Sequence, residues 1–132
     1  LGSGNFMSEN QDGFVKGRLK SLRYSFKGMV ILIRSEHSIM VQLGIGILVS
    51  IIGFLVGISP TEWMLQTISI GMVLAAEGLN TAVEKLCDFV KPEYDPKIGR
   101  IKDISAGGVG FAALLAVVVG IIIYVPRVAN LL

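Results

Sequence analysis

Charged side chains are scarce in this sequence. Only 17% of its 132 residues are Asp, Glu, Lys or Arg, whereas 52% are hydrophobic. A soluble domain of this length needs a polar surface to cover its core, and this composition supplies too little of one. The single cysteine, Cys87, excludes an intrachain disulfide and a metal site built from cysteines. No GxxxxGK[ST] phosphate loop is present either. The composition indicates a protein that exposes much of its apolar surface to lipid.

Three long apolar stretches account for the hydrophobic excess: residues 39–58, 63–89 and 104–125. The second is free of charge from Trp63 until Glu77, and the third carries no charge at all. About 20 apolar residues cross the hydrocarbon core of a bilayer, and the backbone must be helical there. The sequence therefore predicts an all-α integral membrane protein with three transmembrane helices. We expect a single domain over residues 7–132, and we interpret residues 1–6, before Met7, as a remnant of expression.

The segment before the first span is amphipathic. Between residues 13 and 35, apolar residues such as Phe14, Leu19 and Phe26 recur at spacings of three and four, and basic residues fill most of the gaps. This pattern predicts an N-terminal helix that lies in the membrane interface. A nucleic-acid-binding arm is the alternative, but three spans beside it argue against that, so we expect no nucleic-acid partner.

Basic residues are distributed unevenly between the two sides of the predicted spans. Six of the twelve precede the first span, five lie between Lys85 and Lys102, and only Arg127 follows the third span. Short loops rich in Lys and Arg stay on the cytoplasmic side. We therefore expect the N-terminus and residues 84–103 to face the cytoplasm, with the C-terminus outside.

Four polar residues share one face of the second predicted span. Offsets of 3, 7 and 11 residues from Glu77 place Asn80, Glu84 and Asp88 within an arc of about 80°. An ionisable group at membrane depth costs ~2.5–3.5 kcal/mol on insertion scales, so such a stripe indicates function. Carboxylate and amide oxygens without sulfur suit a hard cation such as Mg²⁺.

These residues suggest a division of chemical roles. Glu36, the only acidic residue between positions 12 and 62, is a second metal ligand if its edge of the membrane folds over the second span. The deeper Glu77 is placed to act as a general base toward a hydroxyl. Lys102 can neutralise phosphates that are being transferred. The alternative is a small oligomeric ion or proton transporter, or a channel, that uses the Glu77 and Glu84 face.

A longer motif surrounds this stripe. The run EGLNTAVE at 77–84, Asp88, the Glu93-Tyr94 pair and GRIKD at 99–103 closely resemble the small prokaryotic diacylglycerol kinases, a family that includes the undecaprenol kinases. The resemblance covers roughly residues 14–125. It implies a homotrimer of three-span subunits in the bacterial cytoplasmic (inner) membrane, with active sites shared between subunits at the cytoplasmic edge. It also implies that ATP, with Mg²⁺, phosphorylates a membrane lipid alcohol.

The resemblance also assigns roles to residues. By the motif, Glu77 is the general base, Glu36 and Glu84 hold the metal, and Asn80 orients the site. The expected nucleotide contacts are Arg18, Asn80, Asp88, Glu93, Tyr94, Lys102 and Asp103. Asp95 departs from the family pattern, in which His commonly follows the Glu-Tyr pair. The loops at 59–63 and 92–96 look more like the undecaprenol kinases, although diacylglycerol stays open as the substrate.

Overall fold

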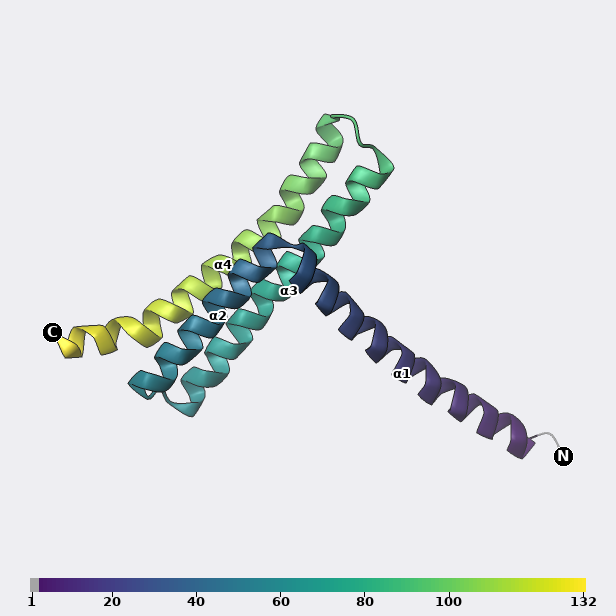
Figure 1. The fold of residues 1–132 in the computed structure, drawn as a ribbon, viewed down its shortest axis with the longest axis horizontal. Helices are drawn as coiled ribbons and strands as arrows, with labels where there is room; N and C mark the ends of the chain where they lie inside the picture. The colour runs from purple at the N-terminus through teal and green to yellow at the C-terminus, as the bar shows by residue number, and fades with distance from the viewer. Residues whose placement is uncertain (1–2) are drawn as a thin grey trace. The chain divides into compact units, whose positions relative to one another are not determined.

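The computed structural model describes the backbone of residues 3–132 and the side chains of residues 11–132. Its elements are four α-helices: α1 (Ser3–Ser35), α2 (His37–Val56), α3 (Pro60–Val90) and α4 (Pro96–Leu131) (Figure 1). The chain forms two compact units: α1 is one, and Glu36–Leu132 is the other. The predicted amphipathic helix is confirmed, and α1 begins earlier than residue 13. The expected remnant, residues 1–6, lies partly outside the described residues.

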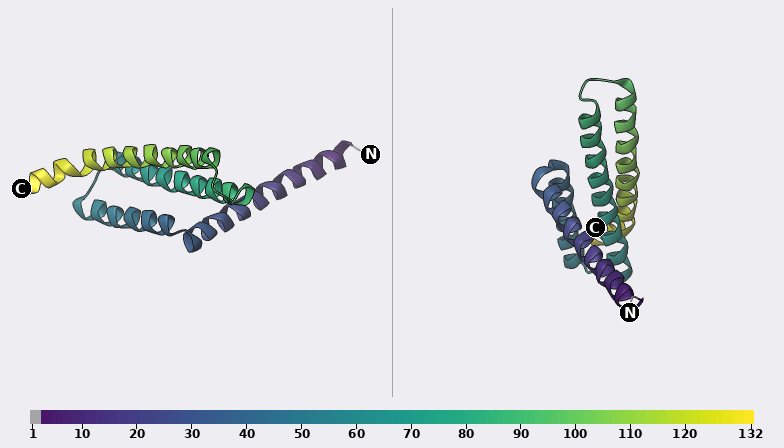
Figure 2. Two further views of the ribbon diagram at one scale, coloured as in Figure 1. Left: turned by 90° about the horizontal axis from the view of Figure 1, so that it is seen from above. Right: turned by 90° about the vertical axis from the view of Figure 1, so that its right-hand side faces the viewer.

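In the second unit, α3 packs against both α2 and α4. The views in Figure 2 show α3 and α4 running side by side up to the loop that joins them. The α2–α3 turn is tight because Gly57 adopts a φ of 71°, which favours glycine, and its N–H donates to the Gly53 carbonyl at 3.0 Å. Ser59 and Glu62 then form a reciprocal capping box, with Pro60 opening α3.

The loop between α3 and α4 is short, because α4 starts at Pro96, ahead of the third apolar stretch, which begins at residue 104. Asp95 caps this helix: its Oδ1 accepts from the Lys97 N–H at 2.8 Å, and Pro96 supplies a first position that needs no N–H partner. The charged residues 97–103 therefore form the first turns of α4 rather than a loop.

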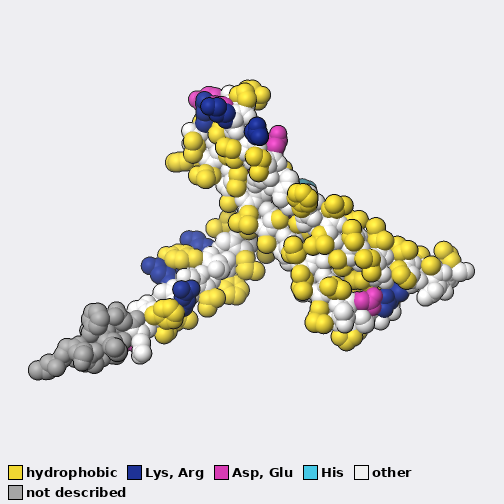
Figure 3. Space-filling model, turned by 180° about the vertical axis from the view of Figure 1, so that it is seen from behind, with side chains coloured by type: hydrophobic (Ala, Val, Ile, Leu, Met, Phe, Trp, Pro, Cys, Tyr) yellow, Lys and Arg dark blue, Asp and Glu magenta, His cyan; other side chains and the backbone are white. Residues whose placement is uncertain are grey.

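Two helices, α2 and α4, are long and apolar enough to cross a membrane. In the most apolar windows of these helices only 17% and 11% of residues are buried, so neither resembles the core helix of a soluble protein. The polar residues Gln66, Glu77 and Asn80 make α3 less apolar, although it is 31 residues long. In Figure 3, a broad apolar surface separates charged groups near the two ends of the α2–α4 unit.

A polar clamp joins the three helices near the α2–α3 turn. The Tyr124 hydroxyl of α4 lies 3.1 Å from the Val49 carbonyl oxygen of α2 and 2.6 Å from Gln66 Oε1 of α3. Nearby, both terminal guanidinium nitrogens of Arg127 donate to the Glu62 carboxylate at 2.7 Å. Such bidentate pairing fixes geometry as well as charge. The clamp therefore aligns α4 with α3 at the end remote from Asp88.

Gly53 makes this clamp possible. A Cβ at this position would lie 2.8 Å from the Tyr124 hydroxyl oxygen and 2.9 Å from an Ile58 methyl carbon. We expect Gly53→Ala to lower the free energy of unfolding by about 1–3 kcal/mol, because the core is overpacked. Gly44→Ala, at a position of α2 with nothing within 4 Å, is the control. Thermal unfolding in detergent tests this; equal stability of the two variants would contradict it.

The Glu62–Arg127 pair predicts a pH dependence. Hydrogen bonding to Arg127 lowers the pKa of Glu62 from 4.5 to about 2. A lowered folded-state pKa stabilises the protein above the unfolded-state value, and this contribution is lost as the pH falls from about 4.5 toward 2. We expect the wild type to be more stable than Glu62→Gln near neutral pH, with the difference shrinking across that window. Thermal unfolding scans of both proteins at several pH values measure this stability difference. A difference that does not change with pH would show that the Glu62–Arg127 ion pair is not its cause.

Candidate active site

The four polar residues of the predicted stripe all lie on α3, and their exposure increases toward its C-terminal end. Glu77 and Asn80 are half-buried, whereas Glu84 and Asp88 are exposed within this chain. Along the helix, Glu77 is about 16 Å from Asp88 at 1.5 Å per residue. The stripe therefore runs from a partly enclosed carboxylate in the apolar region to an open, charged end.

Asn80 links the two parts of the stripe. Its Nδ2 donates to Glu84 Oε1 at 3.0 Å, which fixes one carboxylate oxygen. Its Oδ1 is buried and has no hydrogen-bond partner in the chain. A buried acceptor without a partner is costly. The side-chain oxygen Oδ1 of Asn80 is thus free to accept a hydrogen bond from a group that enters the site.

Glu36 reaches the same part of α3 from the start of α2. Its Oε1 lies 3.2 Å from Lys85 Nζ, and its side chain is 22% exposed. Because Lys85 follows Glu84 directly, this ion pair places Glu36 at about the level of Glu84 along α3. Lys85 was absent from the predicted site, since nothing in the sequence pairs residues 49 positions apart.

The end of the stripe meets the start of α4. Lys102 Nζ lies 2.6 Å from Asp88 Oδ1. The hydrogen bond that Lys102 donates to Asp88 raises the pKa of Lys102, and the charge of Glu84 adds to this effect. The ammonium is therefore held positive beside two carboxylates of α3. Asp103, next in the chain, is exposed.

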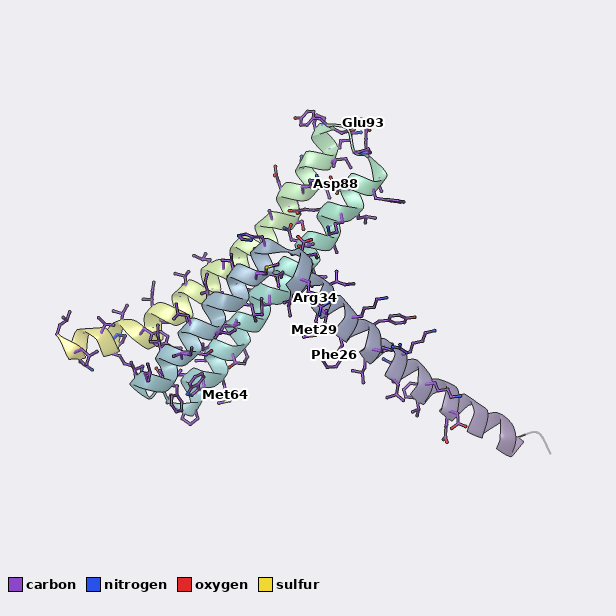
Figure 4. All side chains as sticks on the ribbon, in the orientation of Figure 1. Phe26, Met29, Arg34, Met64, Asp88 and Glu93 are labelled. Carbon is purple, nitrogen blue, oxygen red and sulfur yellow. The ribbon has the colours of Figure 1, made fainter. Side chains whose placement is uncertain are left out.

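A small hollow of about 190 Å³ lies at this end, and Figure 4 labels Asp88 and Glu93 there. It brings together Asp88, Glu93, Tyr94 and Lys102 of the predicted nucleotide contacts, but not Asn80 or Asp103. The full lining is Asp88, Lys91, Pro92, Glu93, Tyr94, Asp95, Ile98, Gly99 and Lys102. Arg18 belongs to the α1 unit, where its guanidinium lies over the Phe14 ring, 5.3 Å from the centroid.

Asp95 has a structural role here. Besides capping α4, its Oδ2 accepts from Lys91 Nζ at 2.6 Å. The hydrogen bond from Lys91 lowers the pKa of Asp95, with a further contribution from the Lys97 N–H. Asp95 thus closes the loop between the two helices. The Asp-Pro-Lys run was the available signal, since Asp before a Pro at the first helical position is a typical N-cap.

The donor set can be tested against Mg²⁺. Among the described residues, no three His, Cys, Asp or Glu side chains are close enough to hold a metal ion. Mg²⁺ binds through one or two carboxylates and completes its shell with water and substrate phosphates. Glu36 and Glu84 therefore fit a metal that arrives with a nucleotide, and they do not fit a metal held by this chain alone.

Comparison with known proteins identifies the family. The model of the family described as prokaryotic diacylglycerol kinase matches residues 23–124, which include the whole stripe and the α3–α4 loop. The undecaprenol kinase of Bacillus subtilis (strain 168) is 32% identical over 108 residues, covering 82% of this chain and 88% of the relative. The diacylglycerol kinase of Escherichia coli (strain K12) is 29% identical over 113 residues, covering 85% and 91%. The chain belongs to the prokaryotic diacylglycerol kinase family and is a lipid kinase.

Proposed function

We propose that this lipid kinase transfers the γ-phosphoryl group of ATP to the primary hydroxyl of a membrane lipid alcohol, with undecaprenol preferred over diacylglycerol. The α3 stripe carries the proposal, because it joins a half-buried carboxylate to a charged, open end beside Lys102. The preference for undecaprenol is supported by the similarity to the Bacillus subtilis enzyme and by the loops at 59–63 and 92–96.

The proposed setting is the bacterial inner membrane. Since α2 and α4 are each able to cross it and α3 packs against both, we propose that α3 crosses as the third span. The N-terminus and the α3–α4 loop would face the cytoplasm, where ATP is present, and the C-terminus would lie outside. We further propose a homotrimer with shared active sites, because Glu84 and Asp88 are exposed within this chain and three helices form too thin a bundle to enclose a site.

In the proposed reaction, Glu77 accepts the proton of the lipid hydroxyl while the hydroxyl oxygen attacks the γ-phosphorus. The bond from that phosphorus to the β–γ bridging oxygen breaks, and ADP leaves. Its depth on α3 suits a lipid whose hydroxyl lies just below the headgroup level. The free Asn80 Oδ1 is available to orient the hydroxyl or the nucleotide. We propose direct transfer from ATP to the lipid hydroxyl, without a phosphorylated enzyme intermediate.

The nucleotide would lie at the open end of the stripe. There the Lys102 ammonium is placed to neutralise charge on the phosphates, and Asp88 holds that ammonium in position. Glu36 and Glu84 would hold Mg²⁺, which when bound neutralises phosphate charge during transfer. Glu93, Tyr94, Asp103 and Arg18 are proposed as further nucleotide contacts.

Phosphoryl transfer from labelled ATP tests the proposal. The purified full-length protein is assayed in mixed micelles with undecaprenol and diacylglycerol offered in parallel, and Glu77→Gln serves as the blank. We expect more label in undecaprenyl phosphate than in phosphatidic acid. The reverse order would make diacylglycerol the substrate, and label in neither lipid would contradict the proposed reaction and favour an ion-transport role for the stripe.

A further inference from the structure

A cavity of about 420 Å³ lies between α2, α3 and α4. Most of its lining is aliphatic, as with Ile45 and Val49 of α2, Ile70 and Val73 of α3, and Ala113 and Val117 of α4. On α3 the lining ends at Val73, about one helical turn before Glu77, and it includes none of the four polar residues of the stripe. The cavity is therefore separate from the candidate active site.

One end of the cavity contains a buried amide whose donor is not used. Gln66 lines the cavity and is 4% exposed. Its Oε1 accepts a hydrogen bond from the Tyr124 hydroxyl at 2.6 Å, but its Nε2 has no hydrogen-bond partner among the described residues. A buried donor without an acceptor is unfavourable, above all in apolar surroundings. The amide therefore calls for an acceptor that another molecule supplies.

The other polar groups of the lining narrow the chemistry of that molecule. The Ser69 hydroxyl already donates to a backbone carbonyl of the preceding turn at 2.8 Å. The Tyr124 hydroxyl is directed to Gln66 and to the Val49 carbonyl oxygen. Gln42 also lines the cavity but is less buried, and none of the described charged side chains does so. A buried amide donor beside a long apolar lining suits an uncharged oxygen acceptor that is joined to a hydrocarbon chain.

Small residues of α4 leave room for such a chain. Ala113, Ala116 and Gly120 all line the cavity, and a Cβ added to Gly120 would meet nothing within 4 Å. The volume lies within the range of ordinary ligand pockets, about 300–1,000 Å³, and far exceeds the ~30 Å³ that one water occupies in the liquid. A bridging water would satisfy Nε2 but leave the apolar lining uncovered, whereas a hydrocarbon chain covers it.

The position of Gln66 along α3 suits the ester group of a phospholipid. Gln66 follows two residues after Met64, which Figure 4 labels near the α2–α3 turn. It lies about 9 Å along the helix from Pro60, and the headgroup region on each side of a bilayer is ~5–8 Å thick. With α3 crossing the membrane as proposed above, the amide lies close to the level at which ester groups meet the hydrocarbon.

We propose that this cavity binds an acyl chain of a phospholipid from the leaflet at the α2–α3 turn, with Gln66 Nε2 donating a hydrogen bond to the ester carbonyl oxygen. This lipid is not the one that is phosphorylated. Gln66 and Glu77 are about 16 Å apart along α3, whereas the ester and hydroxyl groups of one glycerol are only a few bonds apart. The inference rests on the proposed crossing of α3 but not on the proposed reaction, so it is tested without phosphoryl transfer.

Selective ¹⁵N labelling of glutamine reports on this site, because Gln11, Gln42 and Gln66 are the only glutamines of the chain. The side-chain amide signal of Gln66 in the full-length protein is assigned by its loss in Gln66→Leu. The protein is kept in a maltoside detergent, which has no carbonyl group. It is titrated with diacyl phosphatidylcholine or with the dialkyl ether analogue of the same chain length. Neither lipid has a free hydroxyl, so neither is phosphorylated.

We expect the diacyl lipid to shift the Gln66 amide protons downfield in a saturable manner. It should bind about threefold to tenfold more tightly than the dialkyl lipid, the factor that one neutral hydrogen bond contributes. Equal binding of the two lipids would overturn recognition of the carbonyl. A signal that neither lipid moves would overturn the lipid site. In that case a changed oligomer mass of Gln66→Leu in light scattering would assign the amide to a contact between subunits, and an unchanged mass would assign it to water.

Two glycines of α4 provide matched variants. Gly120→Leu fills the cavity, and we expect the affinity for both lipids to fall at least about tenfold, since each excluded methylene weakens binding about fourfold. Gly110→Leu adds the same side chain outside the lining, where a Cβ also meets nothing within 4 Å, and should bind both lipids as the wild type does. Ala116→Leu is the second cavity-filling variant and serves if Gly120→Leu does not fold. Wild-type affinity in a folded cavity-filling variant would contradict the proposal.

Discussion

Replacing Glu77 with glutamine is expected to reduce phosphoryl transfer about 10²–10⁴-fold, the range that a positioned general base contributes. Glutamine keeps the size and hydrogen-bonding reach of the side chain but cannot accept the hydroxyl proton. Glu77 is half-buried, and none of the ion pairs among the described residues involves it. The substitution therefore leaves no oppositely charged side chain unpaired. The loss should therefore appear in kcat, with the KM for ATP and the melting temperature close to those of the wild type.

The control variant is Glu62→Gln, which makes the same type of substitution at another glutamate of α3. Glu62 lies about 22 Å from Glu77 along α3, in the polar clamp at the end of the helix remote from the stripe. Glu62→Gln should transfer phosphate at a rate close to the wild type near neutral pH, despite its lower stability. If Glu77→Gln retained most of its turnover, another group would have to accept the proton and the proposed role of the stripe would be wrong.

Local sequence patterns were sufficient to predict the helices. The spacing of apolar residues at about 3.6 positions predicted α1 and its apolar face. The long apolar stretches predicted α2 and the greater part of α3 and α4. The periodicity of α3 also placed Glu77, Asn80, Glu84 and Asp88 on one side, because a helix face is fixed by spacing alone. Helix α4 starts ahead of the third apolar stretch, because capping by Asp95 begins the helix at Pro96 while the hydropathy rises only at residue 104.

Contacts between helices could not be obtained in this way. Tyr124 and Val49 are separated by 75 positions, and Arg127 and Glu62 by 65. Nothing in the local sequence pairs them, because they meet only when α4 packs beside α2 and α3. The same holds for Lys85 and Glu36, which define one side of the candidate metal site. Gly57 lies within the first apolar stretch, but its left-handed φ makes it the turn that ends α2.

Glu84→Gln is expected to abolish the stabilisation of the protein by an ATP analogue with Mg²⁺. At a concentration one hundred times its Kd, a non-hydrolysable analogue should stabilise the wild type by about 2.7 kcal/mol, which corresponds to a rise in Tm of roughly 5–10 °C. Glu84 is exposed, and Asn80 fixes one of its oxygens. Its carboxylate is therefore available to a metal that arrives with phosphates, and the glutamine amide is a much weaker ligand for Mg²⁺.

Thermal unfolding with and without Mg²⁺ measures this stabilisation in a matched series. Glu36→Gln should keep the Tm increase but shift its Mg²⁺ titration to higher concentration, since the Lys85 ion pair already occupies one Glu36 oxygen. Glu62→Gln should retain the full increase relative to its own baseline. An unchanged increase in Glu84→Gln would remove this residue from the metal site, and an increase that needs no Mg²⁺ would show that the nucleotide is held by Lys102 and the α3–α4 loop without a metal ligand from α3.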